Sequence, residues 1–217
     1  MAAKRMGALQ EKAPEHDVHA KENEQAGPTA RPAPSEAIQP SGLRTRREHD
    51  LLGEALIPAD AYWGIHTLRA VENFPITGVP VGHFPDLVRA LAMVKAAAAR
   101  ANKRLGHLSN EKCTAIEAAC RAIFEEGRFH DQLVVDAVQG GAGTSTNMNV
   151  NEVIANIALE ILGREKGDYA ALHPNDDVNR AQSTNDAYPT ALRLAIIFAA
   201  EPLVTALEEL AFSFKTK

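Results

Sequence analysis

Apolar side chains that recur at alternating spacings of three and four residues constrain the fold of this 217-residue chain more than any other feature. Between residues 84 and 106 the recurring positions are Leu87, Leu91, Val94, Ala98, Ala101 and Leu105. This spacing places them on one face of a helix. Gly106 follows the last of them, at a position where glycine commonly ends a helix. The pattern predicts an amphipathic helix that buries this face.

Two further segments show the same helical period. Ser109 can cap a second helix, which ends near Gly127 and turns four apolar residues inward: Cys113, Ile116, Cys120 and Ile123. A third helix is predicted from about 145 to 162, with Gly163 after its end. Its predicted buried residues are Val150, Val153, Ile154, Ile157 and Ile161.

A fourth helix is predicted from roughly 186 to 214. Pro189 lies near its first turn, where proline is tolerated, whereas Pro202 lies in its interior and should kink or break it. Before the first helix, the stretch HDLLGEALIPADAYWGIHTL has short apolar pieces separated by Gly53, Pro58 and Gly64. Such pieces are typical of one or two short strands and turns. The fold class is therefore mainly α, with a small irregular β element near its start.

Composition excludes several classes of partner. The net charge of −5 argues against nucleic acid, because phosphates require a basic face. The longest strongly apolar run, LAIIFAA, stops at Glu201, so we expect no membrane segment. The first residues contain no apolar run of the kind that a secretory signal needs, and several acidic residues argue against a mitochondrial transit peptide.

The two cysteines, Cys113 and Cys120, are seven residues apart in a predicted helix. Their Cα atoms would then be roughly 10 Å apart, too far for a disulfide. A reducing, cytoplasmic location is expected. Residues 1–43 contain five prolines and almost no large apolar side chains, so they cannot offset the entropy of ordering. We expect a disordered tail there, without a specific role.

Small polar side chains gather at the starts of two predicted helices. The first group follows the glycines of QGGAGTSTN and begins with Thr144; the second is Ser183, Thr184 and Asn185. Helix N-termini present free N–H groups and a positive dipole end, so these hydroxyl and amide donors could bind a carboxylate. The competing interpretation is that they only cap their helices, which is the commoner role of such residues.

Other ligands find little support in the sequence. The glycine run is not followed by a lysine and does not match the phosphate-binding patterns, so nucleotide binding is not expected. His66, His83 and His130 have no metal-ligand spacing, and we expect neither a metal nor a cofactor. His173 and Asp176 could form a pair, although such turns commonly satisfy their own hydrogen bonds.

Three stretches carry a resemblance to a known family: DLLGEALIPADAYWGIHTLRAVENFPI, QGGAGTSTNMNVNEVIANIALEILG and HPNDDVNRAQSTNDAYPTALRLAI. Together they resemble the aspartase/fumarase superfamily, from about Arg47 to the C-terminus and in the same order. The resemblance implies an N-terminal domain of that fold over 44–182 and the first long helix of a central helical bundle over 183–217.

The closest resemblance is to the aspartate ammonia-lyases of this superfamily. His66 and Ser145 stand where the class II fumarate hydratases typically have glutamine. The pair Ser183–Thr184 stands where fumarases tend to have two serines. A class II fumarate hydratase remains the alternative.

This resemblance implies a reversible anti elimination of ammonia from L-aspartate to give fumarate, without a cofactor, in a homotetramer whose sites combine segments of three subunits. By analogy Thr144, Ser183 and Thr184 bind the β-carboxylate, and Asn185 binds the amino end of the substrate. His173, Asn175 and Asp176 match a secondary dicarboxylate site of the fumarase branch. Asp177 replaces the usual histidine, and its negative charge should weaken anion binding there.

The family's general base is a serine in a Gly-Ser-Ser loop, and these 217 residues contain no Ser-Ser pair. Family members are about twice as long. We therefore expect this chain to supply the carboxylate-binding half of a site, to hold no catalytic base and to be inactive alone. The alternative is an inactive remnant or an interaction protein.

Overall fold

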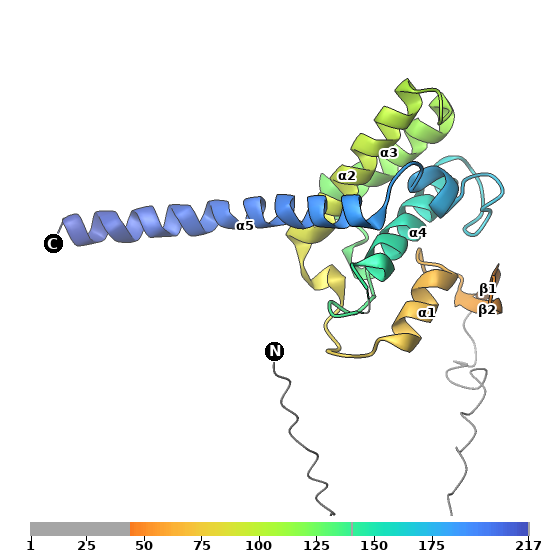
Figure 1. The fold of residues 1–217 in the computed structure, drawn as a ribbon, viewed down its shortest axis with the longest axis horizontal. Coiled ribbons are helices and arrows are strands. Elements are labelled where there is room, and N and C mark those ends of the chain that lie inside the picture. The colour runs from red at the N-terminus through yellow and green to blue at the C-terminus, as the bar shows by residue number, and fades with distance from the viewer. Residues whose placement is uncertain (1–43, 140, 217) are drawn as a thin grey trace, which may run out of the picture. The chain divides into compact units, whose positions relative to one another are not determined.

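The computed structural model describes residues 44–139 and 141–216. A two-stranded sheet is followed by five α-helices (Figure 1). The elements are β1 (Thr45–Asp50), β2 (Gly53–Pro58), α1 (Ile65–Asn73), η1 (Val81–His83), α2 (Pro85–Arg104), α3 (Asn110–Phe124), η2 (His130–Gln132), α4 (Thr144–Ile161), η3 (Pro174–Val178) and α5 (Thr184–Lys215). The prediction of a mainly α fold with a small β element near its start is confirmed. The predicted tail, residues 1–43, lies outside the described residues.

The β element is an antiparallel hairpin in which Arg47 pairs with Leu56 and Asp50 pairs with Gly53. Gly53 has a φ of 119°, which favours glycine at this turn. The Arg46 side chain leaves the hairpin and donates to the carbonyl oxygens of Ala61 and Trp63, each at 2.6 Å. These bonds fix the segment that leads from β2 into α1.

Helices α2, α3 and α4 share the main apolar core, and α3 matches its prediction closely. The Ser109 hydroxyl accepts from the Lys112 backbone N–H at 3.2 Å and so caps α3. All four residues predicted to face inward on this helix are buried. Both of its cysteines are free thiols.

The buried face of α2 differs from the predicted one. Leu91 is buried as expected, but Leu105 is 69% exposed and Ala101 is also exposed. The residues that are buried instead include Val88, Ala92, Lys95, Ala96, Ala99 and Asn102. The prediction of the face was wrong because two polar residues belong to the buried stripe, and a search for apolar spacing passes over them.

Helix α4 is buried along most of its length, including Val150, Val153, Ile154 and Ile157. Ile161, predicted to be buried, is half exposed because it lies in the last turn, at the edge of the core. Gly163 follows with a φ of 71°, as expected for a residue that ends a helix.

Helix α5 begins at Thr184 and continues through Pro202 to Lys215, so the expected kink or break at Pro202 is wrong (Figure 1). Proline removes one intrahelical hydrogen bond, and on an exposed stretch water can bind the freed carbonyl. Pro189 lies in the second turn rather than the first, because the helix starts two residues earlier than predicted.

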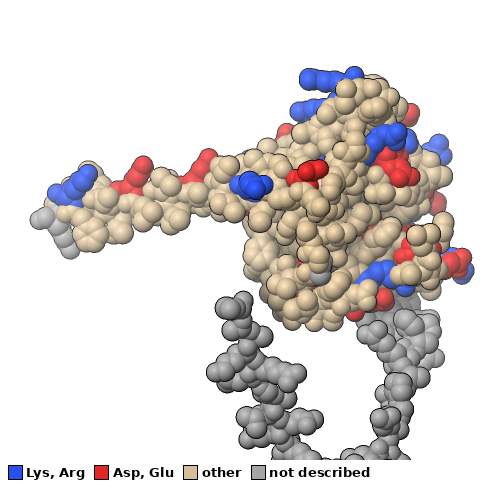
Figure 2. All heavy atoms as spheres, viewed as in Figure 1, with Lys and Arg blue, Asp and Glu red and all other residues tan. Residues whose placement is uncertain are grey.

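The first half of α5 packs on the other helices, through the buried Ala187, Ala191 and Ala195 and the partly buried Phe198. Elsewhere the surface of the helix is largely uncharged (Figure 2), and Ile197, Leu203 and Phe214 are each more than half exposed. By length and composition alone, α5 could cross a membrane, a criterion that core helices of soluble proteins also meet. The absence of a membrane span therefore stays a prediction.

Candidate functional site

The two predicted polar clusters lie at the starts of α4 and α5. Gly143 precedes α4 with a φ of 84°, so Thr144 is the first helical residue. Ser183 precedes α5, and its hydroxyl accepts from the Asn185 backbone N–H at 3.1 Å. Thr184 is thus the first residue of α5, as Thr144 is of α4. The capping interpretation is correct for Ser183, while Thr144 and Thr184 occupy equivalent positions in the first turns.

The first turns of α4 and α5 are in contact. Asn147, one turn into α4, donates from Nδ2 to Thr184 Oγ1 at 3.2 Å. On the other side, a side chain added at Gly143 would overlap the ring of Tyr188, one turn into α5. The structure therefore brings the N-terminal ends of both helices together, each with its positive dipole end and its small polar side chains.

Gln139, which comes before the glycines that lead into α4, bonds to Thr146 in the first turn of that helix. Its Oε1 accepts from the Thr146 backbone N–H at 3.0 Å, and its Nε2 donates to Thr146 Oγ1 at 2.7 Å. The preceding turn is fixed by Asp136, whose carboxylate accepts from the backbone N–H groups of Thr77 and Val138, each at 2.7 Å. These bonds set the position at which the chain enters α4 and hence the position of Thr144.

Lys95 lies beneath the contact between the two first turns and is fully buried. Its ammonium donates to Asn147 Oδ1 at 2.7 Å, to Asn179 Oδ1 at 2.8 Å and to Gln182 Oε1 at 3.0 Å. Burial lowers the pKa of Lys95 to about 7. Sequence reasoning missed this residue. The available signal was a lysine spaced four and seven residues from the buried Leu91 and Val88 of α2.

Glu152 of α4 holds the start of α1. Its fully buried carboxylate accepts from the backbone N–H groups of Gly64 and His66 at 2.9 Å and from Thr67 Oγ1 at 2.6 Å. His66 Nδ1 lies 3.1 Å from Glu152 Oε1, and this hydrogen bond raises the pKa of His66. His66, one of the residues by which the chain resembles aspartate ammonia-lyases rather than fumarases, is thus held by Glu152. Glu152 lies two helical turns after Thr144 on α4.

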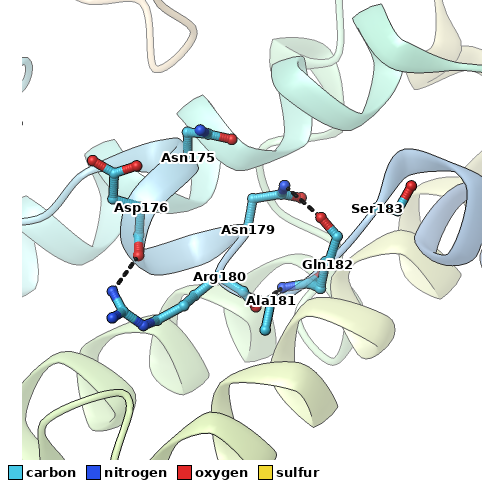
Figure 3. A pocket seen from close by; sticks show the side chains of 7 residues that line it. All are labelled: Asn175, Asp176, Asn179, Arg180, Ala181, Gln182 and Ser183. Atoms are coloured by element: carbon cyan, nitrogen blue, oxygen red, sulfur yellow. Dashed lines mark hydrogen bonds between the residues drawn. The ribbon is translucent and has the colours of Figure 1, made fainter.

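A pocket of about 580 Å³ lies beside the entrance to α5 (Figure 3). Ser183 lines it together with Asn175 and Asp176 of the predicted secondary site, and with Arg180, which the sequence analysis did not single out. The Arg180 guanidinium donates to the Asp176 carbonyl oxygen at 3.1 Å. Thr144 is not among the lining residues, so the pocket joins only part of the predicted set.

His173, the third predicted residue of the secondary site, satisfies its own turn. Its Nδ1 accepts from the backbone N–H groups of Asn175 and Asp176, both at 3.1 Å. The negative charge of Asp177, which was expected to weaken anion binding here, is paired in the structure. Its carboxylate lies 2.7 Å from Lys112 Nζ, from α3, and also accepts from the His173 backbone N–H. Within the described part of the chain, no three His, Cys, Asp or Glu side chains gather as metal ligands would.

Comparison with known proteins identifies the family. Residues 53–217 match the model of a family described as lyase. The aspartate ammonia-lyase of Pseudomonas aeruginosa is 60% identical over 173 residues, which are 80% of this chain and 36% of the relative. The chain thus spans little more than a third of the length of the curated relatives that it matches.

Solved structures agree in fold. A Brucella melitensis structure described as fumarate lyase:delta crystallin is 60% identical, with a TM-score of 0.78, over 80% of this chain and 39% of that one. A class II fumarase from Schistosoma mansoni is 38% identical, with a TM-score of 0.63, over 70% of this chain and 32% of that one. The chain belongs to this lyase family, and its resemblance to the aspartase/fumarase superfamily is confirmed.

Proposed function

We propose that this chain forms the carboxylate-binding segment of an aspartate ammonia-lyase, which eliminates ammonia from L-aspartate to give fumarate. The observation that carries the proposal is the bond between Asn147 and Thr184, which joins two helix N-termini. Both helix starts belong to a chain that is 60% identical to a curated aspartate ammonia-lyase. The weaker identity to a class II fumarase favours this branch over the hydratase.

The arrangement suits the charge that the reaction develops. Removal of a Cβ proton next to a carboxylate produces a doubly negative aci-carboxylate. Thr144, Ser183 and Thr184 offer neutral hydroxyl donors, and the two helix ends add positive partial charge. These groups stabilise the transition state more than the ground state, because the negative charge is greater there. In this proposal Asn185 binds the amino end of the substrate.

The proton acceptor comes from elsewhere. We assign it to a serine in a Gly-Ser-Ser loop, a motif that residues 1–217 do not contain. In the proposed homotetramer, segments of three subunits meet at each site, and this chain supplies one of them. Alone it should release no measurable ammonia, because proton transfer by a positioned base commonly contributes about 10²–10⁴-fold to the rate.

A chimeric enzyme tests the proposal. Residues 45–217 would replace the matching segment of the Pseudomonas aeruginosa aspartate ammonia-lyase, and ammonia release from L-aspartate would be measured beside the parent enzyme. We expect an active chimera and an inactive 217-residue chain. A folded tetrameric chimera without activity would refute the proposed function, and so would turnover by the chain alone.

The same chimera distinguishes the two branches. A fumarate hydratase would convert fumarate to malate in the absence of ammonia, whereas an aspartate ammonia-lyase requires ammonia for the reverse reaction. Hydration of fumarate by the chimera counts for the hydratase only if the parent enzyme does not also hydrate fumarate. The parent enzyme is therefore assayed as the reference. We expect fumarate consumption by the chimera to depend on ammonia.

A further inference from the structure

The buried ammonium of Lys95 determines how three amide side chains are oriented. Below its pKa of about 7 the buried Lys95 is an ammonium, which has three donors and no acceptor, so every group that bonds to it must then present an oxygen. Asn147, Asn179 and Gln182 each do so, at 2.7, 2.8 and 3.0 Å. The three amides come from α4 and from the segment that precedes α5. Their orientation is therefore a consequence of one charged group on α2.

The orientation of Asn147 passes to Thr184. With Oδ1 on Lys95, the amide nitrogen of Asn147 faces Thr184 Oγ1 at 3.2 Å and Asn179 Oδ1 at 3.1 Å. A hydroxyl that accepts a hydrogen bond keeps its own proton for another acceptor. Thr184 is partly exposed at the start of α5, beside Ser183 of the pocket. Its proton is thus available to a ligand.

We propose that Lys95 is a positioning residue: it orients the Asn147 amide and thereby makes the Thr184 hydroxyl a donor to the carboxylate of the substrate. This inference rests on the proposed function, because it assumes that Thr184 meets a carboxylate. Lys95 itself touches no substrate. It acts through Asn147. Because Asn147 Oδ1 accepts from Lys95, Asn147 Nδ2 must donate to Thr184 Oγ1.

The reversed arrangement shows why the direction matters. If the Asn147 amide were turned over, its N–H₂ group would face the Lys95 ammonium, and two donors would oppose each other in a buried site. Its oxygen would then face Thr184 and take the hydroxyl proton. A carboxylate arriving at Thr184 would meet a lone pair instead of a proton.

The first measurement uses the 217-residue chain and needs no activity. At pH 6, where Lys95 is charged, NMR would follow hydrogen exchange of the Asn147 side-chain amide in the parent, in Lys95→Met and in the control Asn102→Ala. Asn102 is buried on the same face of α2 and donates to the Arg180 carbonyl oxygen, but has no bond to Asn147. We expect slow exchange in the parent and the control, and loss of protection in Lys95→Met. Protection retained in Lys95→Met would overturn the inference.

The second measurement uses the chimera and the variant Asn147→Asp. Aspartate keeps an acceptor for Lys95, so the buried lysine remains paired, but it can only accept from Thr184. We expect kcat to fall about 100-fold, with a much smaller change in KM, as when one donor to an oxyanion is removed. Asn102→Ala should stay close to the parent chimera in both constants.

The outcomes separate the two proposals. An active chimera whose Asn147→Asp variant keeps its kcat would overturn the role of Lys95 and leave the proposed function standing. An inactive but folded parent chimera would remove the proposed function, and the inference that depends on it would fall with it. Should Lys95→Met fail to fold, Asn147→Asp alone decides, because its ion pair with Lys95 preserves the buried contact.

Discussion

Asn147 Nδ2 lies 3.2 Å from Thr184 Oγ1, and this bond joins the first turns of α4 and α5. The two residues are 37 positions apart in the chain. Neither helix alone has more than the ordinary polar residues of a helix start. Because the two starts are held together, two positive dipole ends lie near each other. The bond therefore turns two capping segments into one candidate anion site.

The Thr184 hydroxyl should be required for turnover by the chimera. Thr184→Val keeps the size and removes the donor, and we expect kcat to fall by about 10²–10³-fold. Thr184→Ser keeps the hydroxyl and should retain most of the activity. Thr190→Val, at an exposed position further along α5, is the matched control. Ammonia release measures all four proteins, and equal rates for Thr184→Val and the parent would remove Thr184 from the site.

Gly143 should tolerate no side chain, because two requirements coincide there. Its φ is 84°, and an added Cβ would overlap the Tyr188 ring. Gly163 has a φ of 71° but open space around it, so Gly163→Ala should lose only the conformational term, about 1–2 kcal/mol. Gly143→Ala should lose clearly more free energy of unfolding in urea. If overlap with the Tyr188 ring causes the larger loss at Gly143, the double variant Gly143→Ala/Tyr188→Ala should recover part of that loss. Equal losses of free energy of unfolding in Gly143→Ala and Gly163→Ala would contradict the overlap.

The parts of the fold that could be predicted from sequence are those that local spacing determines. Helix α3 is the clearest example, because its cap and its buried stripe lie within fifteen residues of one another and face one core. The clusters at Thr144 and Ser183 could also be located, since helix starts have a recognisable residue preference. The short strands followed from apolar pieces and glycine, although their pairing in a hairpin was not predicted.

The remaining features depend on contacts between distant segments. Lys95 bonds to Asn179, 84 positions away, and no spacing rule links a lysine in an apolar stripe to that amide. Asp177 is paired with Lys112, which is 65 positions earlier, so local sequence could not show this ion pair. The face of α2 was misassigned for a related reason: its many alanines offer several faces of similar apolarity, and tertiary contacts select one.

Stability should depend on pH through Lys95. Its pKa is lowered to about 7 in the folded chain, against 10.5 ordinarily. Between these values the unfolded chain binds a proton that the folded chain does not, so the free energy of unfolding rises with pH, by up to about 1.4 kcal/mol per unit. Below pH 7 the folded chain holds a buried charge, and this gain is absent. Lys95→Met lacks the group.

Urea unfolding of the parent and of Lys95→Met from pH 6 to pH 9 would measure the effect as a difference between the two proteins. Subtraction removes the contribution of Cys120, whose pKa is raised by burial and whose thiol is present in both. We expect the parent to gain stability relative to the variant as the pH rises through this range. Parallel curves would show that Lys95 titrates near its ordinary value.

His66 should titrate above the usual range of histidine because of Glu152. The hydrogen bond to that carboxylate raises the pKa of His66, although partial burial opposes it. A raised pKa means that the proton stabilises the folded chain below the ordinary value of 6.5, and that this contribution is lost as the pH rises through the folded value.

An NMR titration of the ring Cε1–H in the 217-residue chain measures the pKa of His66 directly. Glu152→Gln should bring the pKa of His66 down, whereas Glu160→Gln, which changes an exposed glutamate of the same helix that bonds to Tyr62, should not. If both variants left His66 unchanged, the carboxylate of Glu152 would not be the group that holds the proton on the ring.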